Sequence, residues 1–299
     1  ESLLIKDLLT PDARVRISGF GFTYVRDTRE NCSVRFGLLE LIAKGEPGDK
    51  CRYNASDPTR GSYITAEYNV SIPQLGANIG FHKFQASYNF YYTFPKFKNM
   101  TIAGRAILGL ATVFSAANRF NNVQFPDLNN ILPVSERFFA GGSNTLRGFD
   151  FEEAGPRIVI EPQGTFLNSA GNSVYLAPFT VPFGGNAMAV INLEARVPIS
   201  KSIRVVPFYD GGNVFRRIGD IFNPPDVPAN DVFRQNLRAL WTHTAGIGLR
   251  LKTPIGGEFG VDYGRLLNPP RFLIPQTVGP NAIYQLRQDQ IHFRFSQAF

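Results

Sequence analysis

The sequence predicts an all-β protein, and more specifically a transmembrane antiparallel β-barrel. Apolar and polar residues alternate over segments of about 10 to 13 residues, whereas strands of soluble proteins usually run about 5 or 6. The 299 residues include 27 Phe, 11 Tyr and 28 Gly, and only 18% are charged, against roughly 25% in soluble domains. A soluble β-sandwich also alternates, but these lengths favour the tilted strands of about 9 to 11 residues that cross a bilayer.

The segment "HKFQASYNFYYTF", residues 82–94, shows the alternation most clearly. Polar side chains such as Lys83, Gln85 and Asn89 occupy one face of the expected strand. In a membrane barrel the polar face lines the lumen, the apolar face meets lipid, and closure of the sheet pairs every backbone N–H and C=O. The expected lipid face carries Phe84, Ala86, Tyr88, Phe90, Tyr92 and Phe94.

The same pattern predicts nine strands joined by connections of alternating length. Short turns of such barrels usually face the periplasm and long loops the outside, so the longest loop, 115–186, is expected outside and the long connection 26–60 falls, by parity, on the periplasmic side. In chain order the strands are expected near 13–25, 61–73, 82–95, 100–114, 187–199, 202–215, 237–252, 256–267 and 284–298.

The turn insertion 26–60 contains both cysteines of the chain, Cys32 and Cys51, which lie 19 positions apart. A disulfide between them would suit an oxidising compartment such as the periplasm, and two free thiols are the alternative. Neither a CxxC pair nor a nearby histidine accompanies them, so no metal site is predicted.

Charge and motif content exclude several classes of function. The net charge is +7, but Lys and Arg are scattered without a basic run, so nucleic acid is not an expected partner. The three histidines fall on different expected strands, and neither GxSxG nor a metal-binding spacing occurs. We therefore expect no enzymatic activity and no cofactor.

The chain ends on "QIHFRFSQAF", which places Phe293, Phe295 and Phe299 on one face of the last expected strand. A terminal aromatic residue that closes a barrel strand is expected of a bacterial outer-membrane protein. An ordinary edge strand is the alternative, and the strand lengths favour the membrane.

Several motifs in order resemble one family. "GFTYVRDTREN", "FFAGGSNTLRGFDFEEAGPR", "FYDGGNVF" and "GIGLRLKTPIGGEFGVDYG" together resemble the C-terminal barrel of the BamA/TamA family of outer-membrane assembly factors, most closely its TamA-like members. The resemblance implies that residues 1–299 form about nine C-terminal strands of a barrel of about sixteen. Earlier strands, or another chain, would complete the barrel, and periplasmic POTRA domains would precede it.

The resemblance assigns the loop 115–186 a defined place. Its Arg147, Gly148 and Phe149 match the family's (V/L)-R-G-(F/Y) signature, which implies a loop folded back into the lumen. Gly148, without a Cβ, would let the backbone turn tightly and approach the barrel wall.

The wall residues that would meet this loop also follow from the resemblance. Phe208, Asp210 and Gly212 occupy the family's F-x-D-x-G positions, which face the lumen, and alternation turns Glu194 inward as well. Arg147 is therefore expected to contact Asp210 with Glu194 nearby, because a guanidinium suits a bidentate carboxylate contact. The alternative is a solvated loop arginine, since exposed pairs contribute little.

The resemblance implies a function that is not enzymatic. Client proteins would be inserted into or moved across the outer membrane at a lateral seam, where a client strand pairs with the last strand, 284–298. Expected partners are membrane lipids, unfolded outer-membrane clients, and periplasmic or lipoprotein subunits. A two-partner secretion transporter of the same superfamily and the barrel anchor of an outer-membrane hydrolase are the alternatives.

Overall fold

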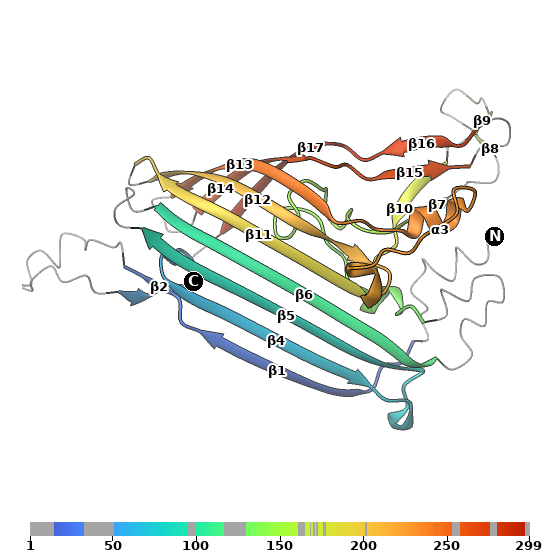
Figure 1. Ribbon diagram of the computed structural model, residues 1–299, viewed down its shortest axis with the longest axis horizontal. Coiled ribbons are helices and arrows are strands. Elements are labelled where there is room, and N and C mark those ends of the chain that lie inside the picture. Colours follow the sequence, from blue (N-terminus) through green and yellow to red (C-terminus); the bar gives the residue numbers. More distant parts are fainter. Residues whose placement is uncertain are drawn as a thin grey trace, which may run out of the picture.

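The computed structural model describes residues 15–32, 51–94, 100–116, 130–160, 165–167, 169, 171, 173–175, 178–200, 202–252, 258–275 and 280–296. These residues form one large antiparallel sheet of nine strands in which each strand pairs with its neighbours along the chain (Figure 1). The prediction of an all-β fold is confirmed. In sheet order the strands are β1 (Gly19–Asp27), β4 (Gly61–Ser71), β5 (Ile79–Phe94), β6 (Met100–Ala116), β11 (Ala187–Pro198), β12 (Ile203–Phe215), β13 (Thr242–Lys252), β14 (Glu258–Leu266) and β17 (Asp289–Ser296).

Shorter elements lie in the connections, where the alternation pattern predicted none. Among the described residues they form two-stranded sheets, one short helix and three 3₁₀ turns, none of which belongs to the large sheet. No helix in the described part of the chain is long and apolar enough to cross a membrane. These elements are β2 (Glu30–Asn31), β3 (Arg52–Tyr53), η1 (Pro73–Leu75), η3 (Val134–Glu136), β7 (Arg157–Ile160), β8 (Thr165–Leu167), β9 (Ser173–Tyr175), β10 (Phe179–Pro182), η4 (Ile218–Ile221), α3 (Val232–Leu237), β15 (Arg271–Ile274) and β16 (Ala282–Gln285).

The last expected strand, 284–298, differs from the structure. The large sheet gains its last strand only at Asp289, whereas residues 282–285 pair with β15 in a separate hairpin. Between the two, Leu286 is buried and its N–H bonds the Pro270 carbonyl, which turns the chain inward. The single strand expected over 284–298 is therefore split into β16 and β17, because Leu286 between them packs into the core.

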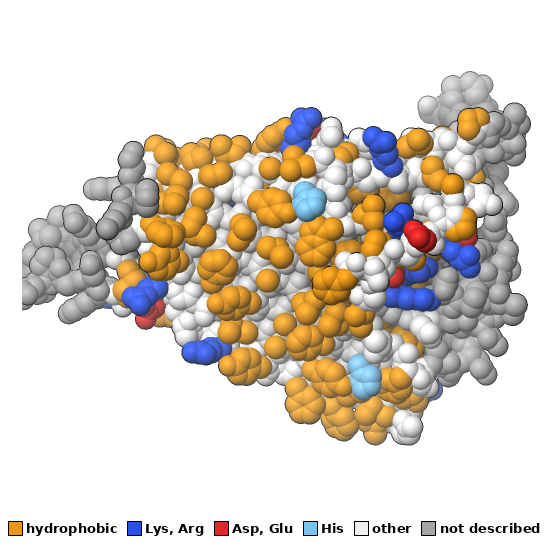
Figure 2. Space-filling model, in the orientation of Figure 1, with side chains coloured by type: hydrophobic (Ala, Val, Ile, Leu, Met, Phe, Trp, Pro, Cys, Tyr) orange, Lys and Arg blue, Asp and Glu red, His pale blue; other side chains and the backbone are white. Residues whose placement is uncertain are grey.

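The two faces of the large sheet differ as alternation requires. On β11, Ile191 and Leu193 are exposed while Asn192 between them is buried, and on β17 Phe293 and Phe295 are exposed. Figure 2 shows hydrophobic side chains spread broadly over the outer face of the sheet. An apolar outer surface of this extent is the face that a barrel strand presents to lipid.

The inner face of the sheet is covered by part of the long loop, residues 130–160. The sheet curves around this loop (Figure 1), which contacts β5 through Lys83–Glu136 and β6 through Arg105–Asn144. The main hydrophobic core thus lies inside the curve, between strands and loop. Its members come from five strands of the large sheet, the loop and the β15–β16 region, and include Phe81, Ile107, Leu132, Phe138, Leu146, Phe149, Met188, Val214, Leu266, Phe272 and Leu286.

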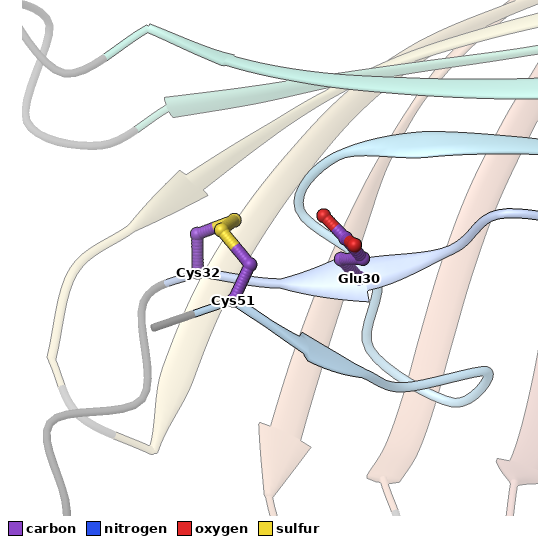
Figure 3. Close-up of side chains that lie close together, drawn as sticks. All are labelled: Glu30, Cys32 and Cys51. Atoms are coloured by element: carbon purple, nitrogen blue, oxygen red, sulfur yellow. A yellow bond between two sulfur atoms is a disulfide. The ribbon is translucent and has the colours of Figure 1, made fainter. Parts of the chain in front are cut away.

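The connection between β1 and β4 contains a small hairpin, β2–β3, closed by a disulfide between Cys32 and Cys51. Figure 3 shows Glu30 beside the two cysteines, and its carboxylate lies within 4.8 Å of both sulfurs. Because the sulfurs are bonded to each other they are not thiolates, and thiolates are the form of cysteine that binds metals.

Alternation assigns Ile247, near the middle of β13, to the lipid face, and its side chain is 52% exposed. We expect Ile247→Arg to lower the free energy of unfolding by about 2 to 4 kcal/mol, because a guanidinium near the bilayer midplane loses its hydration. Urea unfolding of the protein folded into vesicles measures this. Phe222→Arg is the matched control, since Phe222 is 89% exposed in a loop; an equal loss in both variants would contradict the assignment.

The hairpin disulfide predicts a labelling pattern. In the intact protein, a bulky maleimide should modify both Cys32 and Cys51 after treatment with a dithiol reductant and neither before it, because only a thiolate reacts. Gel mobility reports the number of labels. The Cys32→Ser variant provides the control, since Cys51 should then react without reductant, and labelling of the unreduced native protein would rule out the bridge.

Candidate functional site

A compact turn in the long loop presents Arg147. Ala140 and Ala154 pair in a short bridge at the base of the turn, and the Gly142 N–H bonds the Phe149 carbonyl. Leu146 on one side of the arginine and Phe149 on the other lie in the hydrophobic core. The arginine is therefore held by apolar anchors on both sides, so its direction is fixed by packing.

The Arg147 guanidinium contacts two carboxylates of the barrel wall. Nε donates to Asp210 Oδ2 at 2.8 Å, Nη2 to Asp210 Oδ1 at 2.6 Å, and Nη1 to Glu194 Oε1 at 2.7 Å. The Arg147 backbone N–H also donates to Asp210 Oδ2, at 3.0 Å. With side chains 3% and 0% exposed, Arg147 and Asp210 form a buried, two-pronged ion pair.

The Arg147 guanidinium stacks on the ring of Phe208. The Cζ atom of Arg147 lies 3.5 Å from the ring centroid, in a cation–π arrangement. A Cβ at Gly246, opposite Phe208 on β13, would lie 2.2 Å from that ring. A Cβ at Gly264 would lie 2.5 Å from the Arg147 carbonyl oxygen. These two glycines therefore leave the space that the ring and the loop backbone fill.

Two further glycines stand where the chain passes too close to its neighbours for a side chain, Gly148 in the loop and Gly212 on β12. A Cβ at Gly148 would lie 2.3 Å from the Thr244 hydroxyl and 2.8 Å from Leu266. Gly212 has a φ of 137°, and a Cβ there would lie 2.1 Å from the Ala189 carbonyl oxygen. Any larger residue at either position must displace backbone or a buried side chain.

A second group of charges continues from Glu194 toward the last strands. Arg250 on β13 binds Asp262 on β14 at 2.7 Å and lies 4.0 Å from Glu194. Arg294 on β17 lies 3.6 Å from Glu194 and 3.5 Å from Asp262. Glu194 thus links the loop arginine to β13 and β17, so the site extends across most of the sheet.

The last strand also reaches the loop directly. His292 Nε2 lies 3.0 Å from the carbonyl oxygen of Arg147, at a distance for a hydrogen bond. His292 and Arg294 occupy the inner face of β17, whereas Phe293 and Phe295 occupy the outer face and do not join the loop. Phe299 lies outside the described residues.

The other end of the lumen, near the disulfide hairpin, has its own ion cluster. Asp57 binds Lys252 at 2.6 Å and also contacts Arg204, which in turn contacts Glu258. Burial raises the pKa of Asp57, but Arg204 and Lys252 lower it further, so it lies below its usual value. Asp57 is therefore ionised at neutral pH.

Sequence reasoning named Arg147, Asp210, Glu194 and Phe208, and the structure brings these four together. It did not name several other members of the site. Gly246 and Arg250 stood on the polar face of the alternating segment 242–252, which was the one available signal. Cross-strand register and sheet curvature decide the remaining contacts, those of His292, Asp262, Arg294 and Gly264.

Comparison with known proteins identifies the family of the chain. Residues 51–299 match the Omp85 superfamily domain. Among solved structures, the chain is similar to BamA from Haemophilus ducreyi lacking POTRA domains 1–3, with a TM-score of 0.50 and 21% identity over 82% of this chain. The match covers 40% of that chain, so the present chain spans about two fifths of its length.

These findings confirm the resemblance to a BamA/TamA-type C-terminal barrel and the prediction of an outer-membrane location. The family match takes in well over half of the sequence, including the long loop and eight of the nine strands of the large sheet. The chain belongs to the Omp85 superfamily, a family of outer-membrane proteins for protein insertion and secretion.

Proposed function

We propose that this barrel belongs to a non-enzymatic assembly factor that inserts client proteins into the outer membrane or moves them across it at a lateral seam. One observation carries the proposal: the loop that bears Arg147 is bound at once to the barrel wall and to the last strand. Asp210 and Glu194 hold the guanidinium, and His292 of β17 meets the carbonyl of the same residue.

This arrangement makes the loop a lumen lock for the strand at the seam. A buried ion pair contributes little net free energy of folding, because both charges lose their hydration. Removal of one partner is costly, however, because the other charge stays buried without a counter-charge. The lock therefore fixes the position of the loop more than it adds stability. The inner face of β17 contacts the loop through His292 and contacts Glu194 of the lock through Arg294, while its outer face meets lipid.

The free edge of β17 suits strand addition. In the described part of the chain β17 pairs only with β14, so the N–H and C=O groups of its other edge have no strand partner there. β17 has eight residues and is the shortest strand of the large sheet. An unpaired edge is a template for another strand, which is how we propose that a client strand pairs at the seam.

The proposed partners follow from the same features. Lipids contact the outer face, unfolded outer-membrane clients bind the edge of β17, and periplasmic or lipoprotein subunits deliver them. Earlier strands of the same protein, or strands of another chain, complete the barrel. A two-partner secretion transporter would thread its substrate through the lumen, where the loop and the Asp57 cluster must both move aside.

The lumen lock predicts the effect of breaking it. Arg147→Ala should lower the free energy of unfolding by about 3 to 5 kcal/mol, because Asp210 and Glu194 then stay buried without their cation. Protease cleavage in residues 130–160 should become faster, and assembly of outer-membrane proteins in cells that carry the variant should fall.

Arg265→Ala is the matched control, since Arg265 is exposed and pairs with Asp289 away from the lock. We expect Asp210→Asn to impair assembly as well, because the amide provides only one acceptor for the guanidinium fork. Normal assembly and unchanged loop protection in both lock variants would contradict the proposed role.

The seam is tested by crosslinking in cells. A photoreactive residue in place of Ile291, on the outer face of β17, should crosslink to a newly made barrel protein. The same residue in place of Ile247, on the interior strand β13, provides the control because it is similarly exposed. Equal client adducts at both positions, or none at 291, would refute the seam proposal.

A further inference from the structure

The lumen contains a polar cavity of about 160 Å³ beside the lumen lock. β5, β6 and β11 form its wall, loop residues 143–145 border it, and Arg294 reaches it from β17. Four guanidinium groups line it, those of Arg105, Arg147, Arg196 and Arg294. A cavity of this size with so many hydrogen-bond donors has room for a small ligand.

The charges around this cavity do not balance. Glu194 is the one carboxylate in its lining, and three of the four arginines share it: Arg147 at 2.7 Å, Arg196 at 3.1 Å and Arg294 at 3.6 Å. Arg105 has no carboxylate within 4.0 Å among the described residues. Behind the lining, Asp210 pairs with Arg147 and Asp262 lies 3.5 Å from Arg294. The four guanidinium groups therefore face three carboxylates, and the positive charge left in excess, at Arg105, favours an anion.

Arg105 is also short of hydrogen bonds. Its Nη1 donates to the Asn144 carbonyl at 2.6 Å, but its Nε is buried and has no acceptor. Buried donors are nearly always paired, so one without a protein acceptor next to a cavity is available to a bound anion.

The residue paired with Arg105 on the neighbouring strand has an unpaired acceptor. Asn192 is directly opposite Arg105 in the pairing of β6 with β11, and its Oδ1 is buried without a donor. Its Nδ2 donates to the Thr145 carbonyl at 2.6 Å and to Asp210 at 2.8 Å, which fixes the orientation of the amide. The cavity therefore offers several donors and one acceptor.

We infer that this cavity binds a phosphate group. The oxygens of hydrogen phosphate accept from Arg105 Nε and the neighbouring guanidinium groups, and its O–H donates to Asn192 Oδ1. A carboxylate at neutral pH accepts but cannot donate, so it satisfies only part of the site. The phosphate is either the free ion or the headgroup of a lipid that ends in a phosphate monoester, because a phosphodiester has no O–H to donate. The inference rests on the geometry of the lumen and not on the proposed assembly function.

The bound phosphate would connect elements that the chain alone joins weakly. Arg105 already holds the Asn144 carbonyl of the loop, and Arg294 comes from the last strand. An anion between them bridges β6, the loop and β17, and so stabilises the lumen lock. Phosphate should therefore raise the melting temperature of the folded protein, by an amount that grows with the logarithm of its concentration above Kd.

Calorimetric titration of the full-length protein in detergent micelles tests the inference, with inorganic phosphate, glycerol 3-phosphate and acetate at matched ionic strength. We expect one phosphate bound per protein, with acetate at least about tenfold weaker because it lacks the O–H donor. Phosphatidic acid vesicles, whose headgroup is a phosphate monoester, provide the lipid arm. Tighter binding of inorganic phosphate identifies the free ion, and tighter binding of glycerol 3-phosphate and the vesicles identifies a lipid headgroup.

Arg105→Met should weaken phosphate binding by about tenfold or more, because it removes the unpaired donor and keeps a similar side-chain length. Arg265→Met is the matched control, since Arg265 is exposed and lies outside the cavity lining. Should Arg105→Met fail to fold, Asn192→Leu removes the acceptor and should weaken phosphate binding more than acetate binding. Absence of phosphate binding, or an equal loss in the Arg105 and Arg265 variants, would overturn the inference.

Discussion

The contact between Arg147 and Asp210 is the interaction on which the interior of this barrel depends. Neither charge has access to water, so each requires the other, and the loop and wall must meet in one relative position. Phe208 beneath the guanidinium and Gly246 beneath the ring fit only that position. The hydrophobic core on both sides of Arg147 then packs around a point that the ion pair has already fixed.

This arrangement explains why the interior holds a group of buried charges next to its hydrophobic core. A barrel wall offers every second residue to the lumen, and a greasy lumen would favour many nearly equivalent loop positions. Charged partners separate the correct loop position from displaced ones by a larger difference in free energy, because displacement of Arg147 leaves two carboxylates buried without a cation. Glu194 extends that discrimination to β13 and β17 through Arg250 and Arg294.

The strands were predictable because alternation is a local property of the chain. All nine strands of the large sheet overlap the segments that alternation marked, and the faces of β11 and β17 follow from parity alone. The contacts of Arg147, Asp210 and Glu194 came from a family motif, since nothing local joins residues 63 positions apart. Gly264 and His292 were not predictable, because they meet the loop only after register and curvature are set.

The disulfide hairpin bears on the curvature of the whole sheet. Asp57 lies just before β4, yet it contacts Arg204 on β12, which is four strands away in the sheet. At about 4.8 Å per strand, four steps along a flat sheet would cover roughly 19 Å, well beyond the reach of an aspartate. The contact between Asp57 and Arg204 is possible only because the sheet curves strongly between β4 and β12. The contact fixes the curvature of the sheet at the end near the disulfide hairpin. Strands that pair with β1 or β17 to complete the barrel therefore meet a sheet whose curvature is already set by contacts inside it.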